Sequence, residues 1–187
     1  MKTLVLNGSP HKEGETMTLV GEMRKYLVGQ VDIVSAYYDH ISPCIDCRFC
    51  WEHDGCSIDD AMQSVYANID RYDNVIIASP MQFSELSGAL LSVTSRLQVY
   101  WCAKFFRHVQ LSKKKKNGIL VLTGGGGLGT AKPESTANMI FDHMNAKCIG
   151  KLFSLKTNVI HTHDDTAALD QARALAITLN ELFAQEQ

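Results

Sequence analysis

The sequence predicts an α/β domain in which one parallel, five-stranded sheet lies between two layers of helices. Short runs rich in Val, Ile and Leu recur along the chain, as expected for strands that are covered on both faces. Amphipathic segments separate these runs, which is typical of helical crossovers between parallel strands. A chain of 187 residues, 45% of them hydrophobic, has apolar material for one core and is short for two domains. We therefore expect a single domain over residues 1–187.

Strands and helices are expected to alternate along the chain. The five predicted strands cover approximately Lys2–Asn7, Asp32–Tyr38, Asn74–Ser79, Gly118–Thr123 and Cys148–Leu155. One long helix is predicted over 88–107, because apolar residues repeat there at helical spacing. Ser57 and Thr162 indicate two further helix starts, since each is followed by paired aspartates that suit the positive end of a helix dipole.

Charge and hydropathy argue against several classes of function. Lys and Arg number 18 and Asp and Glu number 20, and this net charge of -2 argues against binding to nucleic acid or acidic lipid. The longest uncharged stretch, 117–131, has 15 residues and is too short to span a membrane. The chain begins without the apolar region of a secretory signal, so we expect a cytoplasmic protein with reduced thiols. The four lysines at 113–116 are interpreted as a solvated loop.

Three loops that follow predicted strands have the composition of a ligand site. The first, NGSPHKEGET at 7–16, precedes a helix, and its amides and hydroxyls could bind a phosphate, although it lacks the lysine of a Walker loop. The second is SPMQFSELSG at 79–88. The third, TGGGGLGT at 123–130, lacks the downstream acidic residue of a dinucleotide fold. Ordinary capped turns or flexible surface loops are the alternatives.

The strand order decides whether these loops can form one site. In an open parallel sheet with the order 2-1-3-4-5, strands one, three and four are neighbours, and ligands bind beyond their carboxyl ends. All three loops would then line one crevice. The glycines at 124–127 would let backbone amides approach a flat ligand closely.

Two of these segments resemble the flavodoxin-like NAD(P)H-dependent FMN reductase superfamily. The phosphate motif GSPRxxGNT of that family is similar to Gly8–Thr16, and its SPxYxxSxSxxxKxxxDR segment is similar to Ser79–Arg96. The positions that stand where the family commonly has Arg, Asn, Tyr, Lys and Asp are His11, Glu15, Gln82, Leu91 and Ser95. A carboxylate at Glu15 is unfavourable beside a phosphate unless it turns away to cap the helix.

The resemblance implies a flavodoxin-like three-layer sandwich that binds FMN. It also implies NAD(P)H as a transient electron donor, because the chain is too short for a separate nicotinamide-binding domain. The implied FMN-binding residues are Ser9, His11, Thr16, Met17, Pro80, Met81, Gln82, Phe83, Ser87, Thr123, Gly124, Gly125, Gly126 and Gly127. No residue stands out as a proton donor, so no catalytic acid or base is assigned.

A run of four cysteines is the most specific motif in the chain. Their spacing is C-x2-C-x2-C-x5-C, in an insertion at about 39–57, and the residues are Cys44, Cys47, Cys50 and Cys56. Three thiolates so spaced can surround one inorganic cube and the fourth can close it, which favours a [4Fe-4S] cluster over zinc. Zinc and free thiols are the alternatives. The run resembles that of the iron-sulfur flavoproteins of the same superfamily.

Other polar and aromatic residues receive simpler interpretations. Cys102 and Cys148 are expected to be buried apolar residues without a role. The histidines at 161 and 163 are expected in a helix-capping turn rather than at a metal. The candidate surface for a homodimer or homotetramer carries the aromatic residues Tyr100, Trp101, Phe105 and Phe106.

The leading hypothesis is an FMN-dependent oxidoreductase or electron-transfer flavoprotein in which a [4Fe-4S] cluster passes electrons to or from FMN. One alternative is a cluster-free NAD(P)H-dependent reductase of FMN, quinones or azo dyes. Another, of a different class, is a non-catalytic redox carrier or sensor. Each hypothesis requires a small-molecule or protein electron donor and acceptor.

Overall fold

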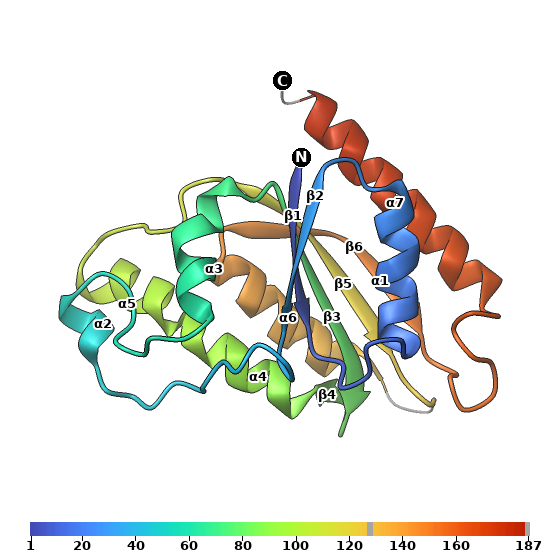
Figure 1. Ribbon diagram of the computed structural model, residues 1–187, viewed down its shortest axis with the longest axis horizontal. Helices are drawn as coiled ribbons and strands as arrows, with labels where there is room; N and C mark the ends of the chain where they lie inside the picture. Colours follow the sequence, from blue (N-terminus) through green and yellow to red (C-terminus); the bar gives the residue numbers. More distant parts are fainter. Residues whose placement is uncertain (127–128, 186–187) are drawn as a thin grey trace.

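The computed structural model describes residues 1–126 and 129–185, in which one central sheet has helices on both faces (Figure 1). Five parallel strands lie in the order β2-β1-β3-β5-β6. Their bounds are Lys2–Asn7 (β1), Gln30–Ser35 (β2), Asn74–Gln82 (β3), Lys116–Thr123 (β5) and Ala146–Ser154 (β6). Counted among themselves, these strands have the predicted order 2-1-3-4-5, which is thereby confirmed.

A short strand that the sequence did not predict completes the sheet. β4 (Glu85–Leu86) pairs antiparallel with the end of β3, which runs three residues beyond its predicted end. The chain reverses at Phe83 and Ser84, whose φ angles are 51° and 57°. Two adjacent residues with positive φ are typical of a two-residue hairpin turn that matches the twist of its strands. The first part of the expected second loop is therefore a hairpin.

The sheet is covered on both faces by helices. On one face lie α1 (Glu15–Tyr26) and α7 (Thr166–Gln185). On the other lie α3 (Met62–Asn68), α4 (Gly88–Thr94), α5 (Gln98–Phe106) and α6 (Ala131–His143), while the short α2 (Phe49–Glu52) packs beside α5 (Figure 1). Among the helices that the structure describes, none has the length and apolar character needed to cross a membrane.

Alternate residues of each strand enter two separate cores. Leu4 and Leu6 of β1 belong to the core under α3, α4 and α6, whereas Val5 belongs to the core under α1 and α7. All three side chains are buried, with at most 1% of their surface exposed. Because both faces are covered, the strands are apolar almost throughout, and this continuous pattern is what identified them.

The long helix expected over 88–107 is interrupted. A 3-10 turn over Ser95–Leu97 separates α4 from α5. The Ser95 hydroxyl donates to Ser92 O at 2.5 Å, and such local side-chain bonds compete with the regular helical pattern. Ser95 lies beside the segment that carries the four cysteines (residues 42–57, the cysteine segment), where its Oγ also accepts from Cys44 N at 3.0 Å.

The two predicted helix starts are displaced along the chain. α3 begins at Met62 and not near Ser57, because Asp60 Oδ1 accepts from Met62 N at 3.0 Å. α7 begins at Thr166, and Asp165 Oδ1 accepts from Ala168 N at 3.1 Å. The second aspartate of each pair is therefore the residue that binds the free amide of the first turn.

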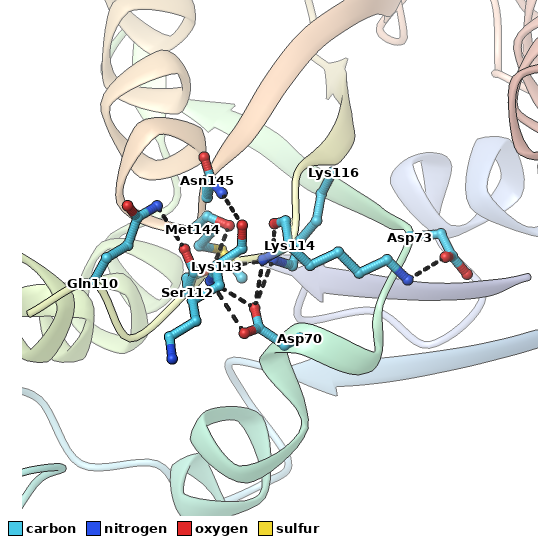
Figure 2. Close-up of polar contacts among 9 residues, drawn as sticks. All are labelled: Asp70, Asp73, Gln110, Ser112, Lys113, Lys114, Lys116, Met144 and Asn145. Atoms are coloured by element: carbon cyan, nitrogen blue, oxygen red, sulfur yellow. Dashed lines mark hydrogen bonds and ion pairs between the residues drawn. The ribbon is translucent and has the colours of Figure 1, made fainter. Parts of the chain in front are cut away.

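The four-lysine run is solvated only in part. Lys116 has a fully buried side chain, and its ammonium group donates to Lys114 O at 2.7 Å and to Ser112 Oγ at 3.0 Å (Figure 2). Asp70 lies 3.4 Å away and accepts the backbone amides of Lys113 and Lys114. Burial lowers the pKa of Lys116, although Asp70 opposes that shift. The interpretation as a solvated loop is thus wrong for Lys116, which anchors the turn before β5.

Candidate functional site

The first loop is fixed to the edge of the sheet where the strands end. Gly8 N donates to Ala78 O at 2.8 Å, and Ser9 N donates to Asn7 Oδ1 at 2.9 Å. A Cβ at Gly8 would lie 2.6 Å from Ser87 Oγ, so only glycine fits here. α1 follows at Glu15. Its N-cap residue is Gly14, and among the described residues no side chain caps the free amides of its first turn. This helix start therefore has backbone donors available for an anion.

The three loops meet at this edge of the sheet. Thr16 Oγ1 and Thr123 Oγ1 lie 2.7 Å apart and are buried, which joins the first loop to the end of β5. A Cβ at Gly124 would lie 3.6 Å from Met81 Cβ, so the second and third loops are in contact as well. The structure thus brings together the three segments that the sequence singled out.

The implied FMN-binding residues differ in how accessible they are. Ser9, Thr16, Ser87 and Thr123 are buried; Met17, Pro80, Met81 and Gly124 are half-buried; His11, Gln82, Phe83, Gly125 and Gly126 are exposed; and Gly127 lies outside the described residues. Ser87 Oγ caps α4 by accepting from Leu90 N at 3.3 Å, so its hydroxyl is engaged within the protein. Phe83 at the hairpin tip is 99% exposed. The role of these residues in binding FMN stays a prediction.

A residue that the sequence analysis missed packs on the third loop. A Cβ at Gly125 would lie 2.3 Å from Asn158 Nδ2, so the glycine makes room for this side chain. Thr157 N also donates to Gly124 O at 3.0 Å. The segment after β6 therefore supports the third loop. No motif in the sequence marks Asn158, because the contact depends on a loop with no regular periodicity.

Glu15 does turn away from the first loop, but toward another segment. His161 Nδ1 lies 2.8 Å from Glu15 Oε1, and Thr162 N donates to Glu15 Oε2 at 2.6 Å. Burial opposes ionisation of Glu15, but these hydrogen bonds outweigh it and lower its pKa to about 2. The same contact raises the pKa of His161. The Glu15 carboxylate is thus bonded to the segment after β6.

The cysteine segment forms a second region beside α4, α5 and α6. Its four cysteines share one pocket of about 560 Å³ with Cys102 of α5, Met139 and Ile140. Cys44 and Cys47 are exposed, whereas Cys50 and Cys56 are half-buried. Cys102 is buried as predicted, but its place in this pocket was not predicted, and Cys148 is only half-buried.

The thiols share a pocket but do not converge. Within 1–126 and 129–185, no three His, Cys, Asp or Glu side chains are placed to hold a metal ion. A hydrogen bond from Ser57 and another from the Phe49 amide lower the pKa of Cys47. Burial, together with the neighbouring Cys102 thiol, raises the pKa of Cys50 to about 12. The donor set of four thiols suits an iron-sulfur cluster by its chemistry, and binding one requires the segment to rearrange.

Aromatic side chains border this segment. Trp51 stacks on Phe106 at 4.3 Å between ring centroids, and Trp101 contacts Phe105 and Phe106. Phe105 and Phe106 are exposed, as a candidate interface requires. Tyr100, expected on the same surface, is instead buried in the core with 6% of its surface exposed.

The parallel sheet between two helical layers, with three loops beyond its strand ends, defines a flavodoxin-like α/β protein. More specifically, the chain belongs to the NADPH-dependent FMN reductase family, whose model matches residues 1–159, so the predicted family is confirmed. The fold is similar to that of the NAD(P)H:quinone oxidoreductase from Methanothermobacter marburgensis, with a TM-score of 0.76 and 15% identity over 96% of this chain and 97% of that one. It is also similar to an FMN-dependent NADH-azoreductase from Bacillus anthracis, with a TM-score of 0.67 and 12% identity over 96% and 99%.

Curated relatives carry the name iron-sulfur flavoprotein. One from Methanosarcina thermophila is 27% identical over 148 residues, which cover 78% of this chain and 73% of the relative. One from Methanocaldococcus jannaschii is 29% identical over 99 residues. That match spans about half of each protein, 51% of this chain and 51% of the relative.

Proposed function

We propose that the protein is an FMN-dependent oxidoreductase that passes electrons between FMN and a [4Fe-4S] cluster. The observation that carries this proposal is the single pocket of about 560 Å³ that contains all four cysteines of the run. Names of the curated relatives support the cluster, and membership of the family supports FMN. FMN when bound exchanges electrons singly or as hydride, whereas the cluster carries them one at a time.

The three loops at 7–16, 79–88 and 123–130, which lie at the carboxyl ends of the strands (the carboxyl-edge loops), are the proposed FMN site. Amides at the start of α1, with Ser9, His11 and Thr16, would bind the phosphate. The flavin ring would lie between the hairpin at 80–83 and the glycines at 124–127, of which Gly127 is not described. Backbone amides in such a position stabilise negative charge on a reduced ring. The bonds of the Glu15 carboxylate to His161 and Thr162 favour this arrangement, because they engage both of its oxygens.

The two regions are close because α4 connects them. Ser87 caps α4 and lies against Gly8, while Ser95 at the other end accepts from Cys44 N. Seven residues of helix span about 10 Å. In addition, the Tyr38 hydroxyl donates to Pro10 O, which ties the start of the cysteine insertion to the first loop. This short separation supports electron transfer between the regions.

A cluster-free NAD(P)H-dependent reductase of FMN, quinones or azo dyes is the second candidate. It is favoured by the lack of convergence among the thiols described above. In both cases we propose that NAD(P)H docks transiently over the flavin, that the acceptor is a small molecule or a protein, and that the location is cytoplasmic.

A homodimer or homotetramer would use the exposed Phe105 and Phe106. Nucleic acid and membranes are not among the proposed partners.

The test is the composition of the protein purified without oxygen. FMN, iron, acid-labile sulfide and zinc are measured on one sample, together with its visible spectrum. We expect one FMN and about four irons with matching sulfide per chain. Flavin without iron, even after anaerobic reconstitution with iron and sulfide, would favour the cluster-free reductase. Absence of flavin binding would contradict the assignment of the three loops.

A further inference from the structure

Arg96 is a buried cation whose bonds go to both sides of the cysteine run. It lies in the 3-10 turn between α4 and α5, and none of its side-chain surface is exposed. Nη1 donates to Ser42 O at 3.0 Å and to Asp60 Oδ2 at 2.6 Å, and Nη2 donates to Ile58 O at 3.2 Å. A buried guanidinium requires such partners, because an unpaired charge in the interior is costly.

Asp60 completes the same junction. Its Oδ2 accepts from Ser42 N at 3.0 Å, and its Oδ1 accepts from Met62 N. The backbone of Ser42 is therefore held at both its amide and its carbonyl group. Ser42 precedes Cys44 and Ile58 follows Cys56, so one side-chain pair closes the cysteine run into a loop with fixed ends.

The run is held less firmly between these ends. Its contacts with the rest of the chain include the Cys44 amide bond to Ser95, the ion pair of Asp54 with Arg107, and the stacking of Trp51. The backbone at Asp46 and Arg48 has φ angles of 50° and 61°, which are uncommon for residues other than glycine. Most of the residues from 42 to 57 are exposed.

We infer that Arg96 is the positioning residue of the cysteine segment. Arg96 holds both ends of this loop, so that the thiols stay at the α4–α5 pocket while the residues between the ends rearrange around a cluster. This inference rests on the cluster in the proposed function. Fixed ends reduce the number of loop conformations and keep the four ligands close to one another. In the sequence, the only signal for Arg96 is its place at the end of the segment 79–96 that resembles the family.

The test compares Arg96→Lys with Arg107→Lys, a matched change in an arginine that contacts the middle of the same segment. Lysine can pair with Asp60 but lacks the planar fork that reaches two carbonyl oxygens. After anaerobic reconstitution with ferrous iron and sulfide, Arg96→Lys is expected to bind iron about ten-fold more weakly, with the FMN content unchanged. Its amide hydrogen exchange over residues 42–58 should be faster, whereas Arg107→Lys should match the wild type in iron.

Equal iron affinity and equal exchange in the two variants would overturn the inference. If Arg96→Lys does not fold, Asp60→Asn replaces it, because it keeps the two carbonyl bonds and removes the charge partner; wild-type exchange and iron affinity there would also overturn it. If the wild type takes up no iron, the proposed cluster fails, and hydrogen exchange over 42–58 still decides whether Arg96 holds the segment.

Discussion

The carboxyl-edge loops and the cysteine segment are built in different ways. The loops are continuous with the strands, and their bonds run directly to the sheet, as between Gly8 and Ala78 or Thr16 and Thr123. The cysteine segment is an insertion whose ends are held by the side chains of Arg96, Asp60 and Gln63 while much of its middle is exposed. A site at strand ends is thus organised by the fold itself, whereas a site in an insertion depends on a few side chains and on its ligand.

The largest expected effect is a loss of iron without a loss of FMN, which would show that the two regions bind their groups independently. Cys47→Ser should lower the iron bound after reconstitution by about ten-fold or more, because a thiolate ligand is lost. FMN content should not change, since no carboxyl-edge loop contains Cys47. Iron, sulfide and FMN per chain are the measurement. Cys148→Ser, outside the pocket, is the control, and a joint loss of FMN and iron in Cys47→Ser would contradict the independence of the regions.

The next effect tests how rigidly the first loop is built. In Gly8→Ala the new Cβ would lie 2.6 Å from Ser87 Oγ and 2.8 Å from Leu90 Cβ. Such overpacking should reduce the free energy of unfolding by about 1–3 kcal/mol and weaken FMN binding. Urea unfolding and FMN titration measure both.

Gly21→Ala is the control for this change. Gly21 lies in α1, and a Cβ there meets nothing within 4 Å. It should therefore stabilise the protein by about 0.5–1 kcal/mol. An unaltered stability of Gly8→Ala would show that the first loop can yield, contrary to a site preformed by the sheet.

A smaller effect concerns the contact between α1 and the segment after β6. The pKa of Glu15 is about 2 in the folded chain, against an ordinary value of 4.5. Its contribution to stability is therefore complete above about pH 4.5 and declines as the pH falls toward 2. The raised pKa of His161 gives the opposite sign, so that its contribution is present at low pH and lost as the pH rises through that pKa.

Glu15→Gln should therefore flatten the acid limb of the stability curve. Because the histidine partner is exposed, we expect the difference between wild type and variant at pH 6 to be about 1 kcal/mol. Urea denaturation at intervals from pH 3 to pH 8 gives the two curves. Parallel curves for wild type and variant would mean that this ion pair does not couple α1 to the later segment.

The smallest expected effect on stability is that of Phe83→Ala. Its ring is 99% exposed, so the free energy of unfolding should change by less than about 0.5 kcal/mol. If the ring contacts the flavin, its loss in Phe83→Ala should nevertheless weaken FMN binding by about two- to ten-fold. Phe105→Ala, another exposed ring, should leave FMN affinity unaltered. Equal FMN affinity in the wild type and Phe83→Ala would remove Phe83 from the site.

The contrast between the regions also explains what the sequence could predict. The strands followed from apolar runs, and the meeting of the three loops followed from the order 2-1-3-4-5 of a flavodoxin-like sheet together with the rule for parallel sheets. Cys44, Cys47, Cys50 and Cys56 were recognisable from spacing, and they do share a pocket. Their arrangement was not predictable, because nothing local shows where an insertion folds back.

Long-range side-chain contacts were the part that periodicity could not reveal. Arg96 bonds to Ser42 and Asp60, and Glu15 bonds to His161, across 36 to 146 residues of sequence. The buried Lys116 likewise bonds to Asp70, 46 residues earlier in the chain. Each of these contacts is set by the tertiary fold and leaves no repeat in the sequence.

An anaerobic reductive titration followed in the visible spectrum shows whether both regions carry a redox centre. If FMN and a [4Fe-4S] cluster occupy the two regions of one chain, the wild type should accept about three electrons per chain. Cys47→Ser, which keeps only the flavin, should accept about two. An uptake of about two electrons by both proteins would contradict the account, because the cysteine segment would then carry no redox centre.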